Sequence, residues 1–136
     1  MSLKQYIIQL IVIGMGGFTG AILRFVISTH VQQLNKGLFF PWGTLSVNLL
    51  GCLFMGILIH LNESLQIFSQ ELKGFIFIGL LGSLTTFSTF SNDALNLLIE
   101  HRYMASMIYM TSQLIFGLCA VFFGRYITQW ILFRIC

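Results

Sequence analysis

Residues 74–92 read GFIFIGLLGSLTTFSTFSN, nineteen consecutive positions without a formal charge. The first half of this stretch is apolar, whereas the second half carries a run of Ser and Thr hydroxyls between Ser83 and Ser91. A helix of this length can cross the roughly 30 Å hydrocarbon core of a bilayer. Because lipid chains cannot hydrogen-bond so many hydroxyls, we expect the second half to face protein, water or an ion.

The composition of the whole chain agrees with a membrane location. Of its 136 residues, 57% are hydrophobic and 8% are charged, and the mean hydropathy is +0.88. A soluble domain needs a more charged surface than this. We predict an all-α integral membrane protein with one domain over residues 1–136 and no part large enough for a soluble enzyme. The predicted transmembrane helices cover residues 5–31, 42–61, 74–99 and 103–127.

The two sides of the predicted spans differ by only a small number of basic residues. Orientation in a membrane follows the asymmetry of Lys and Arg near the span ends, so a small bias permits insertion in both directions. We therefore expect dual topology. The seven basic residues are scattered and form no patch for nucleic acid. The side of the N-terminus collects Lys4, Lys73, Arg125 and Arg134, and the other side collects Lys36 and Arg102.

Small residues in the first three spans indicate close helix contacts. Gly16 and Gly20 have the Gly-x-x-x-Gly spacing, Gly51 and Gly56 lie in the second span, and Gly79 lies in the third. Two interpretations stay open at this point, contacts between helices of one subunit and contacts between two subunits. Four short spans enclose little interior, so a pore is easier to build from two copies, and a homodimer is the economical prediction.

The middle of the third span favours a break in the helix. Gly82, Thr85 and Thr86 weaken helical geometry, and hydroxyl oxygens can replace backbone partners. A broken membrane helix presents carbonyl groups that suit a cation and N–H groups that suit an anion. The alternative is a continuous helix whose Ser and Thr hydroxyls bond to the carbonyl four residues earlier.

Two phenylalanines directly after this point alternate with hydroxyl residues. Phe87 and Phe90 are three positions apart and therefore share one face of a helix. Ring edges carry partial positive charge and hydroxyls donate hydrogen bonds, so the combination suits a small anion, although Phe rings also serve as ordinary packing. Asn48 in the second span carries an uncharged amide deep in the bilayer, which can donate to the same anion or hydrogen-bond to another helix.

Three motifs together resemble the CrcB/Fluc family of fluoride channels. They read GGFTGAILRF over residues 16–25, GTLSVNLLG over 43–51 and GLLGSLTTFSTFS over 79–91, and the similarity covers nearly the whole chain. The resemblance implies an antiparallel, dual-topology homodimer with a broken third helix in the cell inner (plasma) membrane. Two pores lined by both subunits would let fluoride leave the cell passively and lower its toxicity in the cytoplasm.

The resemblance also implies roles for individual residues. Phe87 and Phe90 would be the pore rings and Asn48 the amide donor, and the backbone carbonyls of Gly82 and Thr85 would hold a structural Na⁺ at the centre of the dimer. The hydroxyls along the path would belong to Thr44, Ser88 and Thr89, and Tyr109, Ser112 and Gln113 would continue a polar track in the fourth span.

The resemblance does not assign one role to each of two further positions. Asp93 occupies a position that looks like glutamate in many members of the family. The aspartate side chain is one methylene shorter than glutamate, and the function of Asp93 stays open. Arg24 matches the arginine of the family. Its guanidinium either raises the local anion concentration near the pore or pairs with carbonyls or a carboxylate to hold the fold.

Two other classes of protein are weighed against the channel. Small multidrug-type transporters are also four-span, dual-topology proteins, but they need a carboxylate in the first span to exchange protons for cationic drugs. Residues 5–31 contain Arg24 and neither Asp nor Glu. A membrane scaffold protein would explain the glycines and the balanced charges, but it leaves the TTFSTF run of residues 85–90 without a purpose.

Overall fold

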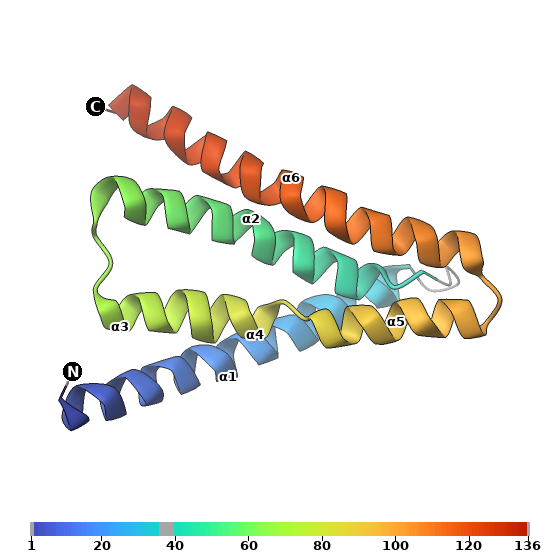
Figure 1. The fold of residues 1–136 in the computed structure, drawn as a ribbon, viewed down its shortest axis with the longest axis horizontal. Helices are drawn as coiled ribbons and strands as arrows, with labels where there is room; N and C mark the ends of the chain where they lie inside the picture. Colours follow the sequence, from blue (N-terminus) through green and yellow to red (C-terminus); the bar gives the residue numbers. More distant parts are fainter. Residues whose placement is uncertain (1, 36–39, 136) are drawn as a thin grey trace.

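The structure is a computed structural model that describes residues 2–35 and 40–135. It contains four helical stretches that are long and apolar enough to cross a membrane, judged by length and composition. The prediction of an all-α chain with four spanning helices is confirmed, and Figure 1 shows the helices side by side in one elongated bundle. Lys36, which enters the charge comparison above, lies outside the described residues.

The four spanning stretches contain the predicted spans, and they extend several residues beyond them. The third span begins at residue 70, four residues earlier than expected, and the second runs on to residue 65. In chain order the elements are α1 (Leu3–Leu34), α2 (Trp42–Leu65), α3 (Gln70–Lys73), the π-helix η1 (Gly74–Leu81), α4 (Gly82–Leu84), α5 (Phe87–Ile99) and α6 (Tyr103–Ile135).

Side-chain caps fix the starts of three helices. Ser2 and Gln5 form a capping box at α1, in which the Ser2 hydroxyl accepts from the Gln5 N–H and the Gln5 side chain accepts from the Ser2 N–H. Ser69 accepts from the N–H of Leu72 at α3. Thr86 accepts from the N–H of Thr89 at α5. The Thr86 cap explains why a new helix begins at Phe87.

Two close helix pairs build the bundle. α2 packs along α6, and α1 packs against η1 and α4. A Cβ atom at Gly20 would collide with the carbonyl of Leu80, and one at Gly56 would collide with the carbonyl of Val121. These two glycines therefore allow helices of the same chain to approach closely, which is the first of the two interpretations left open above.

The third span changes its backbone conformation twice. η1 is a π-helix of eight residues, a rare geometry that is frequent at functional sites. Thr85 and Thr86 then have extended angles, with φ −82° and ψ 155° for Thr85 and φ −151° and ψ 120° for Thr86. Figure 1 shows them as a short non-helical link between α4 and α5.

Helix α5 packs against only part of the bundle among the described residues. Among the described residues it packs against α6 and α2, and it makes no contact with α1. Ser88, Thr89, Asn92 and Asn96 are consequently exposed on its surface. A single copy of the chain therefore presents a polar helix face within a stretch that is otherwise suited to lipid.

Candidate functional site

Asn48 of α2 holds the non-helical link of the third span. The N–H of Thr86 donates to Oδ1 of Asn48 at 2.8 Å, and Nδ2 of Asn48 donates to the carbonyl of Thr86 at 3.2 Å. In a continuous helix that N–H would bond to the carbonyl of Gly82, four residues earlier. Thr86 is buried, so its backbone groups need partners. The Asn48 amide supplies these partners from a neighbouring helix.

A chain of side-chain hydrogen bonds continues from Asn48 toward one end of the bundle. Nδ2 of Asn48 donates to Oε1 of Gln113 at 3.2 Å, and Nε2 of Gln113 donates to the hydroxyl of Tyr109 at 3.4 Å. Oδ2 of Asp93 accepts from the hydroxyl of Tyr109 at 3.2 Å and from that of Thr44 at 2.7 Å. We call the five side chains of Asn48, Gln113, Tyr109, Asp93 and Thr44, together with the backbone of Thr86, the polar chain.

The polar chain joins three helices through partly or fully buried groups. Asn48 and Thr44 come from α2, Asp93 comes from α5, and Gln113 and Tyr109 come from α6. The side chain of Tyr109 is fully buried, with 0% of its surface exposed. Buried polar groups that satisfy one another in this way restrict a structure to one arrangement, because leaving any of them unpaired costs free energy.

Aromatic rings run beside the polar chain. The ring centroids of Phe87 and Phe90 are 5.5 Å apart, and those of Phe90 and Tyr109 are 5.4 Å apart. Phe40 packs edge-on to Tyr109 at 5.4 Å and lies 4.7 Å from Trp42. The row begins at Phe87, whose side chain is 79% exposed, and continues through half-buried Phe90 to buried Tyr109. Ring edges are therefore available along a path from the surface into the bundle.

Hydroxyl groups cluster at the start of α5. The Thr86 hydroxyl donates to the hydroxyl of Thr89 at 3.0 Å and lies 3.3 Å from that of Ser88. The Ser91 hydroxyl bonds back to the carbonyl of Phe87. Ser88 and Thr89 are exposed, so the structure places them at the surface of this copy and outside the polar chain.

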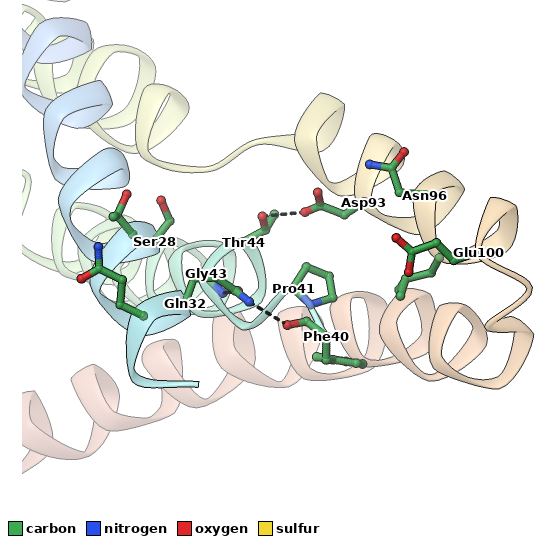
Figure 2. Close-up of a pocket in the computed structure, with 12 residues that line it drawn as sticks. Ser28, Gln32, Phe40, Pro41, Gly43, Thr44, Asp93, Asn96 and Glu100 are labelled. Carbon is green, nitrogen blue, oxygen red and sulfur yellow. Dashed lines mark hydrogen bonds between the residues drawn. The ribbon is translucent and has the colours of Figure 1, made fainter. Parts of the chain in front are cut away.

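Two cavities lie at the two ends of the polar chain. The first, of about 590 Å³, is beside the non-helical link, and the second, of about 700 Å³, lies in the space between α1, α2 and α5. Figure 2 shows the second cavity, with the Thr44 hydroxyl directed at Asp93 and with Glu100 farther along α5. The first is lined by Asn48, Gly51, Cys52, Met55, Thr85, Thr86, Phe87, Phe90, Met110, Gln113, Leu114 and Val121.

The second cavity has a mixed polar lining. Gln32 of α1 fixes its rim, because Nε2 donates to the carbonyl of Phe40 and Oε1 accepts from the N–H of Gly43. Asp93 is a member of the polar chain and also lines this second cavity. The polar chain thus connects a mostly apolar cavity beside the link with a more polar cavity between α1, α2 and α5.

Backbone carbonyls gather where the first half of the third span ends. The helical segment of residues 70–84 stops at Leu84, and the N–H that would meet the Gly82 carbonyl in a continuous helix bonds to Asn48 instead. The Thr85 hydroxyl and N–H both bond to the carbonyl of Leu81, and ψ of 155° turns the Thr85 carbonyl out of the helical direction. Oxygens at a half-helix C-terminus, with its partial negative charge, are suited to a cation such as Na⁺.

The structure brings five of the predicted pore residues together and places Ser88, Thr89 and Arg24 outside this group. Thr44, Asn48, Phe87, Phe90 and Tyr109 all belong to the polar chain or to the ring row. Arg24 lies half-buried in α1 and lines neither of the two cavities. The interpretation of Arg24 as an anion attractor close to the pore therefore gains no support within one copy.

Sequence reasoning missed parts of this site. Gln113 and Ser112 were expected on the same track, but only Gln113 joins the polar chain, and Ser112 lines a different cavity beside Phe40, Trp42 and Arg102. The side chains of adjacent helix residues point in directions about 100° apart. Helical periodicity could therefore have predicted that Ser112 and Gln113 do not line the same track. No sequence signal placed Phe40 on Tyr109, because that contact depends on how the chain turns between α1 and α2.

Fold and site together define a multi-pass, α-helical membrane protein with hydrogen-bonded polar side chains and a row of aromatic rings beside the extended residues Thr85 and Thr86. Comparison with known proteins gives the family. The sequence profile described as "CrcB-like protein, Camphor Resistance (CrcB)" matches residues 11–125. This chain belongs to that family, as the three sequence motifs predicted.

Curated relatives match over most of their length. Fluoride-specific ion channel FluC 1 of Methanosarcina acetivorans is 40% identical over 116 residues, which cover 85% of this chain and 87% of that protein. Fluoride-specific ion channel FluC of Shewanella baltica is 43% identical over 117 residues, or 86% of this chain and 93% of the relative. The protein of the same name from Phocaeicola vulgatus is 34% identical over 121 residues, or 89% and 98%.

Proposed function

We propose that this protein is a fluoride-selective channel that exports fluoride passively across the cell inner membrane and so lowers fluoride in the cytoplasm. It is not an enzyme. The observation that carries the proposal is the meeting of the Asn48 amide, the Thr86 link and the Phe87 and Phe90 rings at one 590 Å³ cavity. The names of the curated relatives, all fluoride-specific ion channels, support the same substrate.

The chemistry of the site favours a small, strongly hydrated anion. Moving such an ion from water into a medium of low dielectric constant costs tens of kcal/mol in the idealised case, so a pore must replace its water with close donors. Amide N–H groups, hydroxyls and ring edges supply these donors without a positive charge that would trap the ion. A larger anion needs a wider lining, which rejects it by constriction.

The functional unit in this proposal is an antiparallel homodimer with two pores lined by both copies. One face of α5 carries exposed residues that would contact lipid if the protein were a monomer. They are Ser88, Thr89, Asn92 and Phe87, and Phe87 has 79% of its surface exposed. A second copy seated on this face would cover the hydroxyls and bring its own rings to the path. Unsatisfied polar groups in hydrocarbon cost several kcal/mol, which favours such a cover.

A structural Na⁺ at the centre of this dimer is part of the proposal. The carbonyls of Gly82 and Thr85 fit a hard cation, and two interrupted helices meeting at a two-fold axis would double the number of oxygens. The bound ion would supply a fixed positive charge that joins the two copies. Purifying the protein with Na⁺ replaced by N-methylglucamine should lower the thermal unfolding temperature and the dimer fraction. Unchanged values would contradict the sodium site.

The direct test of the function is fluoride flux from liposomes. Purified protein is reconstituted into vesicles loaded with the potassium salt of fluoride or chloride. A K⁺ ionophore then lets K⁺ leave together with the anion, so that no membrane potential stops the flux, and a selective electrode follows the released anion. We expect rapid fluoride release and chloride release at the level of protein-free vesicles. Equal release of both anions, or no fluoride release, would refute the proposal. No feature of the site favours the multidrug-type transporter, since α1 carries Arg24 and no carboxylate within residues 5–31.

A further inference from the structure

The hydrogen bonds of the polar chain have only one consistent direction. The N–H of Thr86 is a donor, so the Asn48 group that faces it must be the acceptor Oδ1. Nδ2 of Asn48 therefore faces Gln113 and meets its acceptor, Oε1. Nε2 of Gln113 in turn donates to Tyr109, whose own proton goes to the carboxylate of Asp93. The backbone at one end and the carboxylate at the other fix the orientation of both amides.

This direction leaves no free N–H on Asn48 in the arrangement seen here. One of its two amide hydrogens goes to the carbonyl of Thr86 and the other goes to Oε1 of Gln113. An anion that binds to the Asn48 amide must therefore replace one of these two acceptors. The Thr86 carbonyl is held by the backbone, whereas the Gln113 oxygen is at the end of a flexible side chain that lines the 590 Å³ cavity.

The bonds on either side of Gln113 are the ones that an anion can displace. They measure 3.2 and 3.4 Å, and the bond from Nδ2 of Asn48 to the Thr86 carbonyl is also 3.2 Å, so the two acceptors of Asn48 differ in how they are held and not in bond length. The Gln113 oxygen can move with its side chain, whereas the 2.8 Å bond from the Thr86 N–H keeps Asn48 in place. Hydrogen bonds to a charged acceptor are roughly twice as strong as those between neutral groups. An anion therefore outcompetes the neutral Gln113 oxygen for the Asn48 hydrogen, and Asn48 stays anchored while it does so.

We propose that Gln113 is a positioning residue whose Oε1 occupies the anion-binding hydrogen of Asn48 and is displaced when fluoride arrives. The inference rests on the proposed fluoride function and adds to it a built-in competitor for the ion. Between ions, Gln113 keeps the Asn48 donor satisfied inside the bundle. Because fluoride must displace Gln113, it binds to Asn48 more weakly than it would to a free donor. Weaker binding favours conduction, because an ion that is held too tightly does not leave the pore.

The test separates affinity from maximal flux. Gln113→Met keeps the length of the side chain and removes both the amide oxygen and the amide nitrogen, while Thr86 still anchors Asn48. Initial fluoride flux from liposomes is measured against fluoride concentration. The expected result is a half-saturating concentration lowered by about threefold to tenfold, the range that one neutral hydrogen bond supplies. Gln129→Met, at an exposed position of the same helix, is the matched control and should behave as wild type.

A second variant reverses the effect. Gln113→Glu keeps an acceptor at the same place and adds a negative charge, so the half-saturating concentration should rise above that of wild type. A purely structural role for Gln113 would lower the thermal unfolding temperature and the maximal flux of Gln113→Met without lowering its half-saturating concentration, and that outcome would overturn the inference. Fluoride flux absent from the wild type would overturn the proposed function itself and with it this inference.

Discussion

At the scale of single residues, the site depends on which polar atom faces which. Asn48 was expected to donate to an anion or to bond to another helix, and in the structure it bonds to the backbone of the third span and to Gln113. The sequence could indicate that a buried amide needs a partner, because that requirement is general. It could not identify Thr86 as the partner, because the contact joins residues 38 positions apart.

The two phenylalanines allow a prediction at this scale. Phe87→Ile and Phe90→Ile each remove a ring edge and keep an apolar side chain, so we expect fluoride flux from liposomes to fall by about tenfold or more, equivalent to about 1.4 kcal/mol at the barrier. Of these two rings, Phe90 alone packs against Tyr109, and loss of that ring pair should destabilise the protein by about 0.5–1.5 kcal/mol more than loss of Phe87.

The control for the ring variants is a ring outside the row. Phe122→Ile changes a lipid-exposed phenylalanine of α6 and should leave both flux and stability near wild type. Size-exclusion profiles must show that the Phe87 and Phe90 variants remain folded and keep the oligomeric state of wild type. Normal fluoride flux in both variants would contradict the assignment of the two rings to the pore.

At the scale of helices, the sequence predicted the elements more successfully than their contacts. Uncharged windows located four spans because the cost of burying charge in lipid is large and local. The π-helical geometry of η1 was not predicted, since it depends on how α1 packs against this segment. The glycines predicted close contacts but not their partners, which the structure identifies within one chain for Gly20 and Gly56.

A matched pair of glycines on α6 tests this close packing. A Cβ atom at Gly124 would collide with the carbonyl of Leu53, whereas one at Gly117 would meet Sγ of Cys52 at an ordinary 3.7 Å. Gly124→Ala should therefore force α2 and α6 apart and destabilise the protein by about 1–3 kcal/mol. Gly117→Ala should be neutral or stabilising by up to about 1 kcal/mol, because alanine favours the helix. Thermal unfolding in detergent gives both values, and equal effects of the two changes would refute the packing argument.

At the scale of the whole molecule, the N-terminus, the C-terminus and the connection between α2 and α3 lie at one end of the bundle (Figure 1). Arg125 at this end is already paired, since its guanidinium contacts both carboxylate oxygens of Glu63 at 2.6 and 3.4 Å. At the other end Arg102 pairs with Glu100 at 3.2 Å. Lys and Arg, rather than net charge, decide orientation, so the near balance of basic residues still predicts insertion in both directions.

Adding charge at one end should therefore abolish this balance. Ser64→Lys combined with Gln70→Lys places two more cations at exposed positions beside the two termini, and this end should then stay in the cytoplasm. C-terminal reporter fusions should show both orientations for the wild type and one for the double variant. Since an antiparallel dimer needs both orientations, fluoride flux in cells should fall with the lost orientation. Ser64→Gln with Gln70→Asn is the uncharged control. A single orientation in the wild type would exclude dual topology, and normal flux from a singly oriented variant would exclude the antiparallel dimer.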